Sequence, residues 1–212
     1  MALILTRRRG QRMTEIIMKV IMATGNENKV REVREILAGS DIEVVSMKEA
    51  GIDIDIVEDG STFEENAVIK AEAVCRASGH VTIADDSGLE VDYLNGEPGI
   101  YSSRFMGEDT SYDIKNRAII DALKDAKGEE RSARFVCVMA IAYPDRPTET
   151  YRGVFEGRIA YSPSGANGFG YDPIFYVPEL GCTSADISDE EKNAISHRGK
   201  ALRLAAAALT GK

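Results

Sequence analysis

The order in which β-prone runs and helical patterns follow one another is the strongest constraint on the fold of this 212-residue chain. A β-prone run at 19–23 is followed by the turn-rich TGNEN and then by a helical apolar pattern that ends near Leu37. The alternation continues until Ala133–Tyr143 and Thr150–Tyr161, which predict two neighbouring antiparallel strands. Alternating strands and helices followed by a hairpin predict an α/β fold with a mixed rather than a purely parallel sheet.

The same signals predict the remaining elements. Helices are expected at about 62–77, 112–126 and 197–209, and further strands or extended segments at 42–46, 81–84, 89–93 and 174–177. Ser188 with Glu191 forms a capping box, and Ser196 is expected to cap the last helix. No internal repeat and no low-complexity linker interrupts this pattern, and the length favours either one compact domain or one elongated two-lobed domain over residues 18–212.

Composition excludes several classes of function. The net charge of −9 disfavours a nucleic acid polymer as partner, so an anionic small molecule would need a local basic patch or a bound cation. No apolar run approaches the roughly 20 residues that cross a bilayer, so no membrane association is expected. Three widely spaced cysteines without a CxxC pair favour a reducing cytoplasm. Residues 1–17 are interpreted as a disordered extension or as the product of a start codon upstream of Met18.

Two segments are candidates for binding a polyanion. TGNENK at 24–29 lies between a predicted strand and a predicted helix, where free N–H groups and the positive helix end favour a phosphate. An ordinary strand-to-helix turn with Asn28 as cap is the alternative. Asp85 and Asp86 are expected at the C-terminal end of a strand, and a divalent cation would turn their repulsion into shared attraction. An acidic turn is the alternative there, and because side chains alternate along a strand, only one of the pair need face the site.

Two later segments are candidates for binding a base. GANGFGYDPIF at 165–175 places aromatic rings among glycines that let the backbone approach a ligand, and a ring can stack on a purine. A glycine loop anchored by its aromatic residues is the alternative. His197 and Arg198 begin the last predicted helix, where the helix dipole disfavours cations, and an anion or a base would offset that cost. A solvated basic face is the alternative.

Six motifs together resemble one family closely, the inosine triphosphate pyrophosphatase-like, or RdgB-type, nucleoside triphosphate pyrophosphohydrolases. The matching motifs are ATGNENK, TFEENAVIKA, IADDSGLEVD, PGIYSSR, GFGYDPIF and EKNAISHRGKAL, which run in the family order from about Met18 to the C-terminus. The resemblance implies an elongated, two-lobed α/β domain with a long central mixed sheet flanked by helices, and a nucleotide cleft between the lobes. Residues 1–17 have no counterpart in the family pattern.

The resemblance also implies an activity. It implies Mg²⁺-dependent hydrolysis of ITP, dITP and XTP to the nucleoside monophosphate and pyrophosphate, by a cytoplasmic homodimer. Asp86 takes the role of general base and binds Mg²⁺ with Glu58 or a neighbour, including Glu65. The substrate contacts fall on Thr24, Gly25, Asn26, Glu27, Asn28 and Lys29 for the triphosphate, on Ser87, and on Phe169, Gly170, Tyr171, Asp172, Lys192, His197 and Arg198 for the base.

Three rival functions are distinguishable by experiment. A Maf-like nucleotide pyrophosphatase would have a similar fold but a different base preference. A nucleotide-binding regulator would bind ITP without releasing pyrophosphate, although Asp86 and Lys29 argue against it. A structural α/β scaffold would show no thermal shift with ITP.

Overall fold

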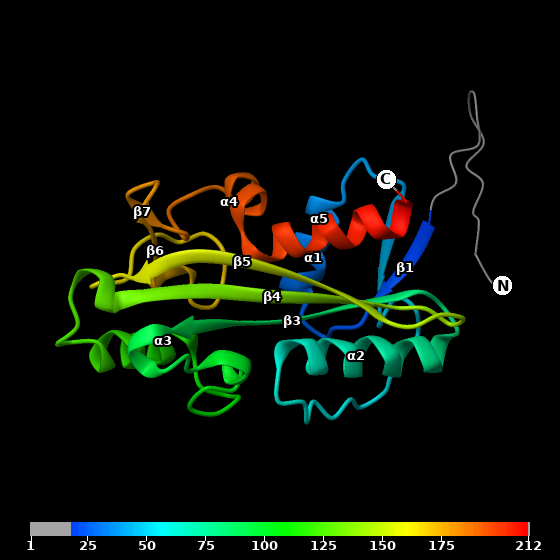
Figure 1. Cartoon of the computed structure of the whole chain (residues 1–212), viewed down its shortest axis with the longest axis horizontal. Helices are drawn as coiled ribbons and strands as arrows, with labels where there is room; N and C mark the ends of the chain where they lie inside the picture. The colour runs from blue at the N-terminus through cyan, green and yellow to red at the C-terminus, as the bar shows by residue number, and fades with distance from the viewer. Residues whose placement is uncertain (1–17, 212) are drawn as a thin grey trace. The chain divides into compact units, whose positions relative to one another are not determined.

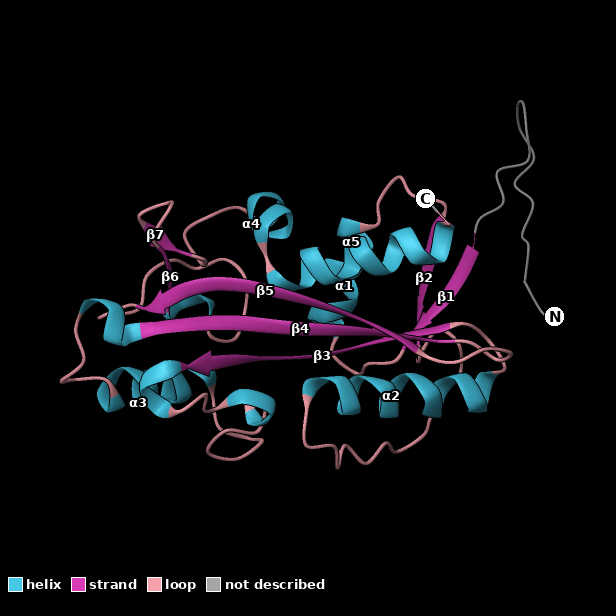
Figure 2. Ribbon diagram, in the orientation of Figure 1, coloured by secondary structure: helices cyan, strands magenta, loops and turns pink. Residues whose placement is uncertain are grey.

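A computed structural model describes residues 18–211 of the chain, and the predicted extension at 1–17 lies outside the described residues. Figures 1 and 2 show its strands and helices along the chain. The strands are β1 (Met18–Met22), β2 (Ile42–Ser46), β3 (Thr82–Val91), β4 (Ser132–Ala142), β5 (Glu149–Ile159), β6 (Phe175–Val177) and β7 (Cys182–Thr183). The helices are α1 (Glu27–Ile36), α2 (Phe63–Ser78), α3 (Tyr112–Ala122), α4 (Asp189–Ile195) and α5 (His197–Thr210).

The strands form one sheet in the order β2-β1-β3-β4-β5-β6-β7. β1 pairs in parallel with β2 and with β3, whereas β6 pairs antiparallel with β5 and β7. The predicted α/β class with a mixed sheet flanked by helices is therefore confirmed. No helix among the described residues combines the length and apolar composition that a bilayer crossing requires.

The described chain divides into two compact units. The first contains residues 18–86, 138–151 and 201–211, and the second contains residues 87–137 and 152–200. The expectation of a single domain with a nucleotide cleft between two lobes stays a prediction.

In the first unit, the strand order creates a topological switch point. The chain leaves β1 through α1 to β2 on one side and returns through α2 to β3 on the other side. Met22 pairs with Ile83, and the Ala23 N–H donates to the Ile83 carbonyl at 2.8 Å, so the loop after β1 begins beside Ala84 of β3. Ligands of open α/β sheets bind outside the carboxyl ends of strands at such a reversal. The fold thus places TGNENK next to the paired aspartates.

One expectation about β3 was wrong. The segments 81–84 and 89–93 were predicted as separate, with Asp85 and Asp86 at the end of the first, but β3 is continuous from Thr82 to Val91. DDSG has low strand propensity, and that local preference is overridden because Ile83, Ala84, Leu89 and Val91 are all fully buried on both sides of it. The aspartates therefore lie in mid-strand.

The second unit has its own hydrophobic core. Its largest buried members include Leu89, Ile119, Phe155, Ile174 and Phe175. Full burial of such side chains stabilises a fold by about 1.5–3 kcal/mol each. Tyr171 belongs to this core, so the core anchors the loop at 165–175 that is a candidate for binding a base.

Two further differences lie in the second unit, one at a helix end and one at an unpredicted strand. α3 ends at Ala122 rather than near residue 126, because the chain turns at Leu123, whose N–H donates to Ile119 and Ile120. The two-residue strand β7 was not predicted, since a pair of residues carries no periodic signal. The capping box of Ser188 and Glu191 is confirmed, and Ser196 Oγ accepts the Gly199 N–H at 3.1 Å at the start of α5.

Candidate functional site

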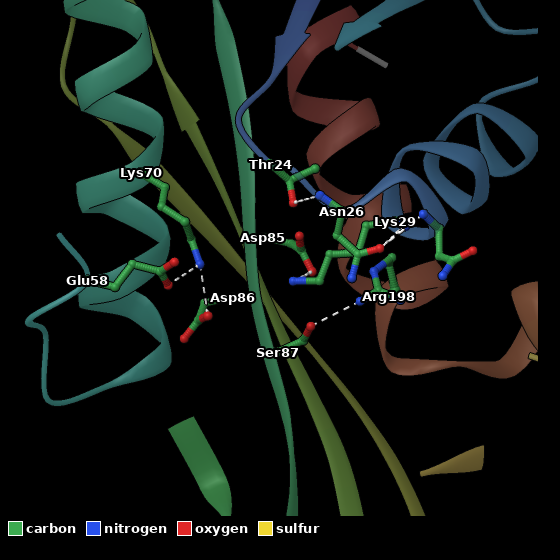
Figure 3. A network of polar contacts seen from close by, with 10 residues as sticks. Thr24, Asn26, Lys29, Glu58, Lys70, Asp85, Asp86, Ser87 and Arg198 are labelled. Carbon is green, nitrogen blue, oxygen red and sulfur yellow. Dashed lines mark hydrogen bonds and ion pairs between the residues drawn. The ribbon is translucent and has the colours of Figure 1, made fainter. Parts of the chain in front are cut away.

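The two adjacent aspartates of β3 point to opposite sides of the strand (Figure 3). Asp85 pairs with Lys29 of α1, and Asp86 pairs with Lys70 of α2. Both aspartates are buried, with exposed fractions of 1% for Asp85 and 7% for Asp86. Successive side chains of a strand alternate between its faces, so the two carboxylates lie on opposite faces of β3 and each pairs with a different lysine. The prediction that only one of the pair faces a given site is consistent with this arrangement.

The loop after β1 is organised by its own side chains. Asn26 is the N-cap of α1, and its Oδ1 accepts the N–H groups of Asn28 and Lys29. The cap is therefore Asn26 and not Asn28. The exposed N–H groups of Gly25 and Glu27 donate to no residue in the described part of the chain, which leaves them available to a ligand.

Lys29 connects this loop to the strand. Its Nζ lies 3.0 Å from Asp85 Oδ2, and its side chain is 17% exposed. A lysine ammonium has three donors, so the contact with Asp85 orients the charge at the start of α1 without exhausting it. The loop thus combines open amides, a helix N-terminus and a fixed cation, as phosphate binding requires.

Lys70 brings two acids together on the other face of β3. Its Nζ lies 2.6 Å from Glu58 Oε2 and 2.9 Å from Asp86 Oδ1 (Figure 3). The second oxygen of Asp86, Oδ2, is buried and accepts no hydrogen bond from any described residue. A buried carboxylate oxygen without a donor is costly unless a ligand supplies the missing contact. This corner of the first unit is therefore built for an additional cation or donor.

Burial and charge act in opposite directions on the buried pair. Burial raises the pKa of the Asp86 carboxyl above its usual range, and the neighbouring Lys70 charge offsets only part of that effect. For Lys70, burial lowers the pKa, but the carboxylates of Asp86, Asp85 and Glu58 outweigh it and raise the pKa above its ordinary value. Lys70 therefore stays protonated, and Asp86 is a stronger base than an exposed aspartate.

The acids fit the donor set of Mg²⁺. In phosphate-handling enzymes this ion is bound through one or two carboxylates together with substrate phosphates and water. Glu58 and Asp86 supply two carboxylates joined by one lysine, and Asp86 Oδ2 supplies an unsatisfied oxygen. Among residues 18–211 no group of three or more acidic, histidine or cysteine side chains is arranged to hold a metal ion, so an ion at Glu58 and Asp86 would need further ligands from substrate or water.

Glu65, the alternative metal ligand, has a different role in this structure. Its Oε2 accepts hydrogen bonds from the Ser61 N–H and Ser61 Oγ, each at 2.7 Å, while Thr62 Oγ1 accepts the Glu65 N–H. These contacts cap α2, and they lower the pKa of Glu65. The geometry therefore favours Glu58 over Glu65 as the partner of Asp86.

The base-pocket candidates of the second unit are held by a buried ion pair. Lys192 Nζ lies 2.7 Å from Asp172 Oδ2, and the same oxygen accepts the Phe169 N–H at 2.8 Å. Asp172 Oδ1 accepts a hydrogen bond from Ser184 Oγ at 2.8 Å. Because the Asp172 carboxylate is engaged on both oxygens, it organises the loop from within.

Two cations lie over the ring of Phe169. Lys192 Nζ is 5.1 Å and the Arg198 guanidinium carbon 5.7 Å from the ring centroid, both within the range of a cation–π contact. Arg198 Nη2 also donates to Ser87 Oγ at 3.0 Å. The His197 ring stacks on Phe135, with centroids 4.8 Å apart and planes 16° apart, so its position is set by the core. These contacts bring Ser87, Phe169, Lys192 and Arg198 into one polar cluster.

The structure thus brings the predicted residues together in two groups. The first unit holds Thr24 to Lys29, which lie on the Asp85 side of β3, and Glu58 and Asp86 on the other side (Figure 3). The second unit holds Ser87, Phe169 to Asp172, Lys192, His197 and Arg198. Sequence reasoning did not single out Lys70, and it left open which of Asp85 and Asp86 faces the site. For Lys70 a signal was present, because it lies between Ala67 and Ala71 on the apolar stripe of α2, where a lysine needs an acidic partner.

Comparison with known proteins finds similar sequences and structures over most of the chain. The sequence model of the Ham1 family matches residues 20–208. A protein of Thermus thermophilus named dITP/XTP pyrophosphatase is 50% identical over 186 residues, which cover 88% of this chain and 89% of that protein. A dITP/XTP pyrophosphatase of Photorhabdus laumondii is 46% identical over 88% of this chain and 95% of its own length. The structure of the Staphylococcus aureus Ham1 protein is 44% identical and superimposes with a TM-score of 0.82, covering 91% of this chain and 98% of that chain.

Proposed function

This chain belongs to the Ham1 family, and from that premise we propose that it hydrolyses non-standard purine nucleoside triphosphates. The substrates are dITP, XTP and ITP, and the products are the nucleoside monophosphate and pyrophosphate. Relatives that are 46% and 50% identical over most of the chain carry the name dITP/XTP pyrophosphatase. The structural observation that carries the proposal is the buried Asp86 carboxylate, which shares Lys70 with Glu58 and keeps one oxygen without a donor among the described residues.

The phosphates bind to the loop between β1 and α1. The open N–H groups of Gly25 and Glu27, the N-terminus of α1 and the Lys29 ammonium all present positive charge to an anion. Glu58 and Asp86 would hold Mg²⁺, which when bound neutralises charge on the triphosphate. Lys70 supplies a further fixed positive charge in the same corner.

Asp86 activates the attacking water. Its carboxylate accepts a proton from the water, the water oxygen forms a bond to the α-phosphorus, and the bond from that phosphorus to the bridging oxygen breaks. Pyrophosphate leaves with the electron pair of that bond. Burial raises the pKa of Asp86, which brings the base closer to working pH, while Lys70 keeps it ionised. Positioning and charge stabilisation supply most of the rate, as in other phosphoryl chemistry.

The base is selected in the cluster around Phe169. A purine stacks on an aromatic ring. N–H donors that face the 6-position donate a hydrogen bond to a 6-oxo group, whereas they have no acceptor in the 6-amino group of ATP. The donors proposed here are His197, Arg198 and the N–H groups of the loop at 168–172 other than those of Phe169 and Asp172, which donate within the loop. Exclusion of GTP rests on the 2-position, for which no residue is assigned.

A homodimer in the cytoplasm is the proposed setting of this activity. Three free cysteines suit a reducing compartment. The apolar side chains of Tyr101, Met106 and Ile114 are 54–56% exposed and could be buried in an interface between two copies of the chain. Light scattering coupled to size exclusion measures the state directly, and a mass of one chain at all concentrations would contradict the dimer.

Pyrophosphate release from a nucleotide panel tests the proposed function. ITP, dITP and XTP should be cleaved with Mg²⁺ and not after chelation, and ATP, dUTP and methylated UTP should be poor substrates. Asp86→Asn, which keeps the size of the side chain, should lower kcat at least about 100-fold, the contribution expected of a general base. A folded Asp86→Asn variant with near wild-type turnover of ITP would exclude Asp86 as the base.

A further inference from the structure

A buried asparagine outside all the motifs holds one peptide of the base-pocket loop. Asn116 of α3 is 3% exposed, and its Nδ2 donates to the carbonyl of Gly170, 54 residues further along the chain, at 3.1 Å. Since a carbonyl only accepts, the NH₂ group is the half of the amide that faces Gly170. The other half, Asn116 Oδ1, is buried and accepts no hydrogen bond from a residue in the described range. The contact with Gly170 is thus the one hydrogen bond that this side chain makes there.

The aromatic residues on either side of this peptide are fixed in place. The Tyr112 ring lies under Gly170, where an added Cβ would meet it at 3.5 Å. The same ring packs edge-on against Tyr171, with centroids 5.2 Å apart, and the Tyr171 hydroxyl donates to the Ser102 carbonyl at 2.8 Å. Gly170 has φ +71°, a conformation that glycine adopts without strain.

The direction of the carbonyl determines the direction of the next N–H group. In a trans peptide the C=O of one residue and the N–H of the next point to opposite sides of the plane. With the Gly170 carbonyl turned to Asn116, the Tyr171 N–H points away from α3. It donates to none of the residues that the structure describes. A donor held in that direction matches a 6-oxo purine, and a carbonyl in its place would match a 6-amino purine.

We propose that Asn116 is a positioning residue for base selection, which keeps the peptide between Gly170 and Tyr171 in the orientation that favours 6-oxo over 6-amino purines. The inference rests on the proposed function and adds to it a residue that does not touch the substrate. Glycine lacks the Cβ that would resist a flipped peptide, so the side chain of Asn116 decides between the two orientations. A hydrogen-bond acceptor at position 116 reverses the preferred orientation of this peptide, because it repels the Gly170 carbonyl and attracts the Tyr171 N–H.

Asn116→Asp is the decisive variant. It replaces the donor by an acceptor of the same shape, so the ratio of kcat/KM for ITP to kcat/KM for ATP should fall by about 10–100-fold, the range expected when a polar group faces a mismatched partner. Asn116→Leu introduces no charge and should lower the ratio by a smaller factor. It also provides the test if the aspartate variant does not fold.

Asn167→Asp is the matched control. Asn167 Nδ2 also donates to a backbone carbonyl, that of Ile187 at 2.9 Å, so this variant loses the same kind of bond close to the same loop. Its ITP to ATP ratio should stay within about twofold of the wild type. An equal fall in both variants would overturn the specific role of Asn116.

Purine riboside triphosphate separates positioning from general damage, because its base has only hydrogen at the 6-position. The Asn116 variants should hydrolyse it as well as the wild type does, while ITP hydrolysis falls. Equal losses on both nucleotides, or an unchanged ITP to ATP ratio in a folded variant, would overturn the inference. If the wild type cleaves no 6-oxo purine triphosphate, the proposed function itself fails, and the inference fails with it.

Discussion

Removing the charge of Lys70 should make the enzyme require a higher pH. Lys70 Nζ lies within 3 Å of both Glu58 Oε2 and Asp86 Oδ1, and the Lys70 and Asp86 side chains are no more than about a tenth exposed. Little water therefore screens the attraction. In Lys70→Met the aliphatic stem is retained, and only the ammonium is lost.

The direction and size of the effect follow from the buried pair. Burial already raises the pKa of Asp86, and the lysine opposes that effect. An opposite charge this close lowers a carboxyl pKa by about 1–3 units, equivalent to about 1.4–4 kcal/mol. Without the lysine the pKa of Asp86 rises further, so the carboxylate is protonated up to a higher pH. The acid limb of the kcat/KM profile should move to higher pH by about 1–3 units.

The assay is pyrophosphate release from ITP across a pH series at fixed free Mg²⁺. Lys70→Arg is the matched control, since it keeps a positive charge in the same place and should leave the acid limb near that of the wild type. If Lys70→Met lowers the rate equally at every pH and the limb stays where it was, the electrostatic coupling of Lys70 to Asp86 is wrong.

Three other experiments test the packing and the loop. Phe175→Ala empties a fully buried position and should lower the free energy of unfolding by about 3–5 kcal/mol in urea titrations, and a loss below about 1 kcal/mol would contradict the core assignment. Gly157→Ala places a Cβ 2.6 Å from the Phe175 ring and 2.7 Å from the Tyr176 carbonyl oxygen, and it should cost about 1–3 kcal/mol in the same titration. A neutral result would mean that both the ring and the neighbouring backbone move aside freely. Lys192→Met leaves the buried Asp172 without its cation and should lower the free energy of unfolding by about 3–5 kcal/mol. Adding Asp172→Asn to this variant should recover part of that stability. If it recovers none, an unpaired buried charge is not the cause of the loss.

Much of the fold was predictable because its signals are local. The helices at 62–77 and 197–209 and the run at 133–143 have strong periodicity or composition, and the structure contains each of them. The continuity of β3 was not predictable, because DDSG reads locally as a turn. Its strand conformation depends on neighbours far along the chain, including Lys29 and Lys70.

The residues of the candidate site that belong to recognisable motifs were predictable, whereas those that are positioned by packing alone were not. Asp86, Lys29 and the loop around Phe169 stand in recognisable segments. Asn116 does not, because its partner Gly170 is 54 residues away and nothing in the sequence links the two. A buried amide on a helix face indicates only that some partner exists, and the fold alone identifies it.

The opposed aspartates of β3 restrict where the hexapeptide IADDSG can be transplanted. Each acid relies on a lysine from a different helix, α1 for Asp85 and α2 for Asp86, so a host scaffold must cover both sides of the recipient strand. In a sandwich of two sheets, where one face of each sheet is exposed to solvent, one of the two aspartates would be exposed without its lysine. Inserting or deleting a single residue ahead of Asp85 would turn the pair over and give each acid the wrong neighbour, so protein engineers should expect this strand to tolerate length changes only in steps of two.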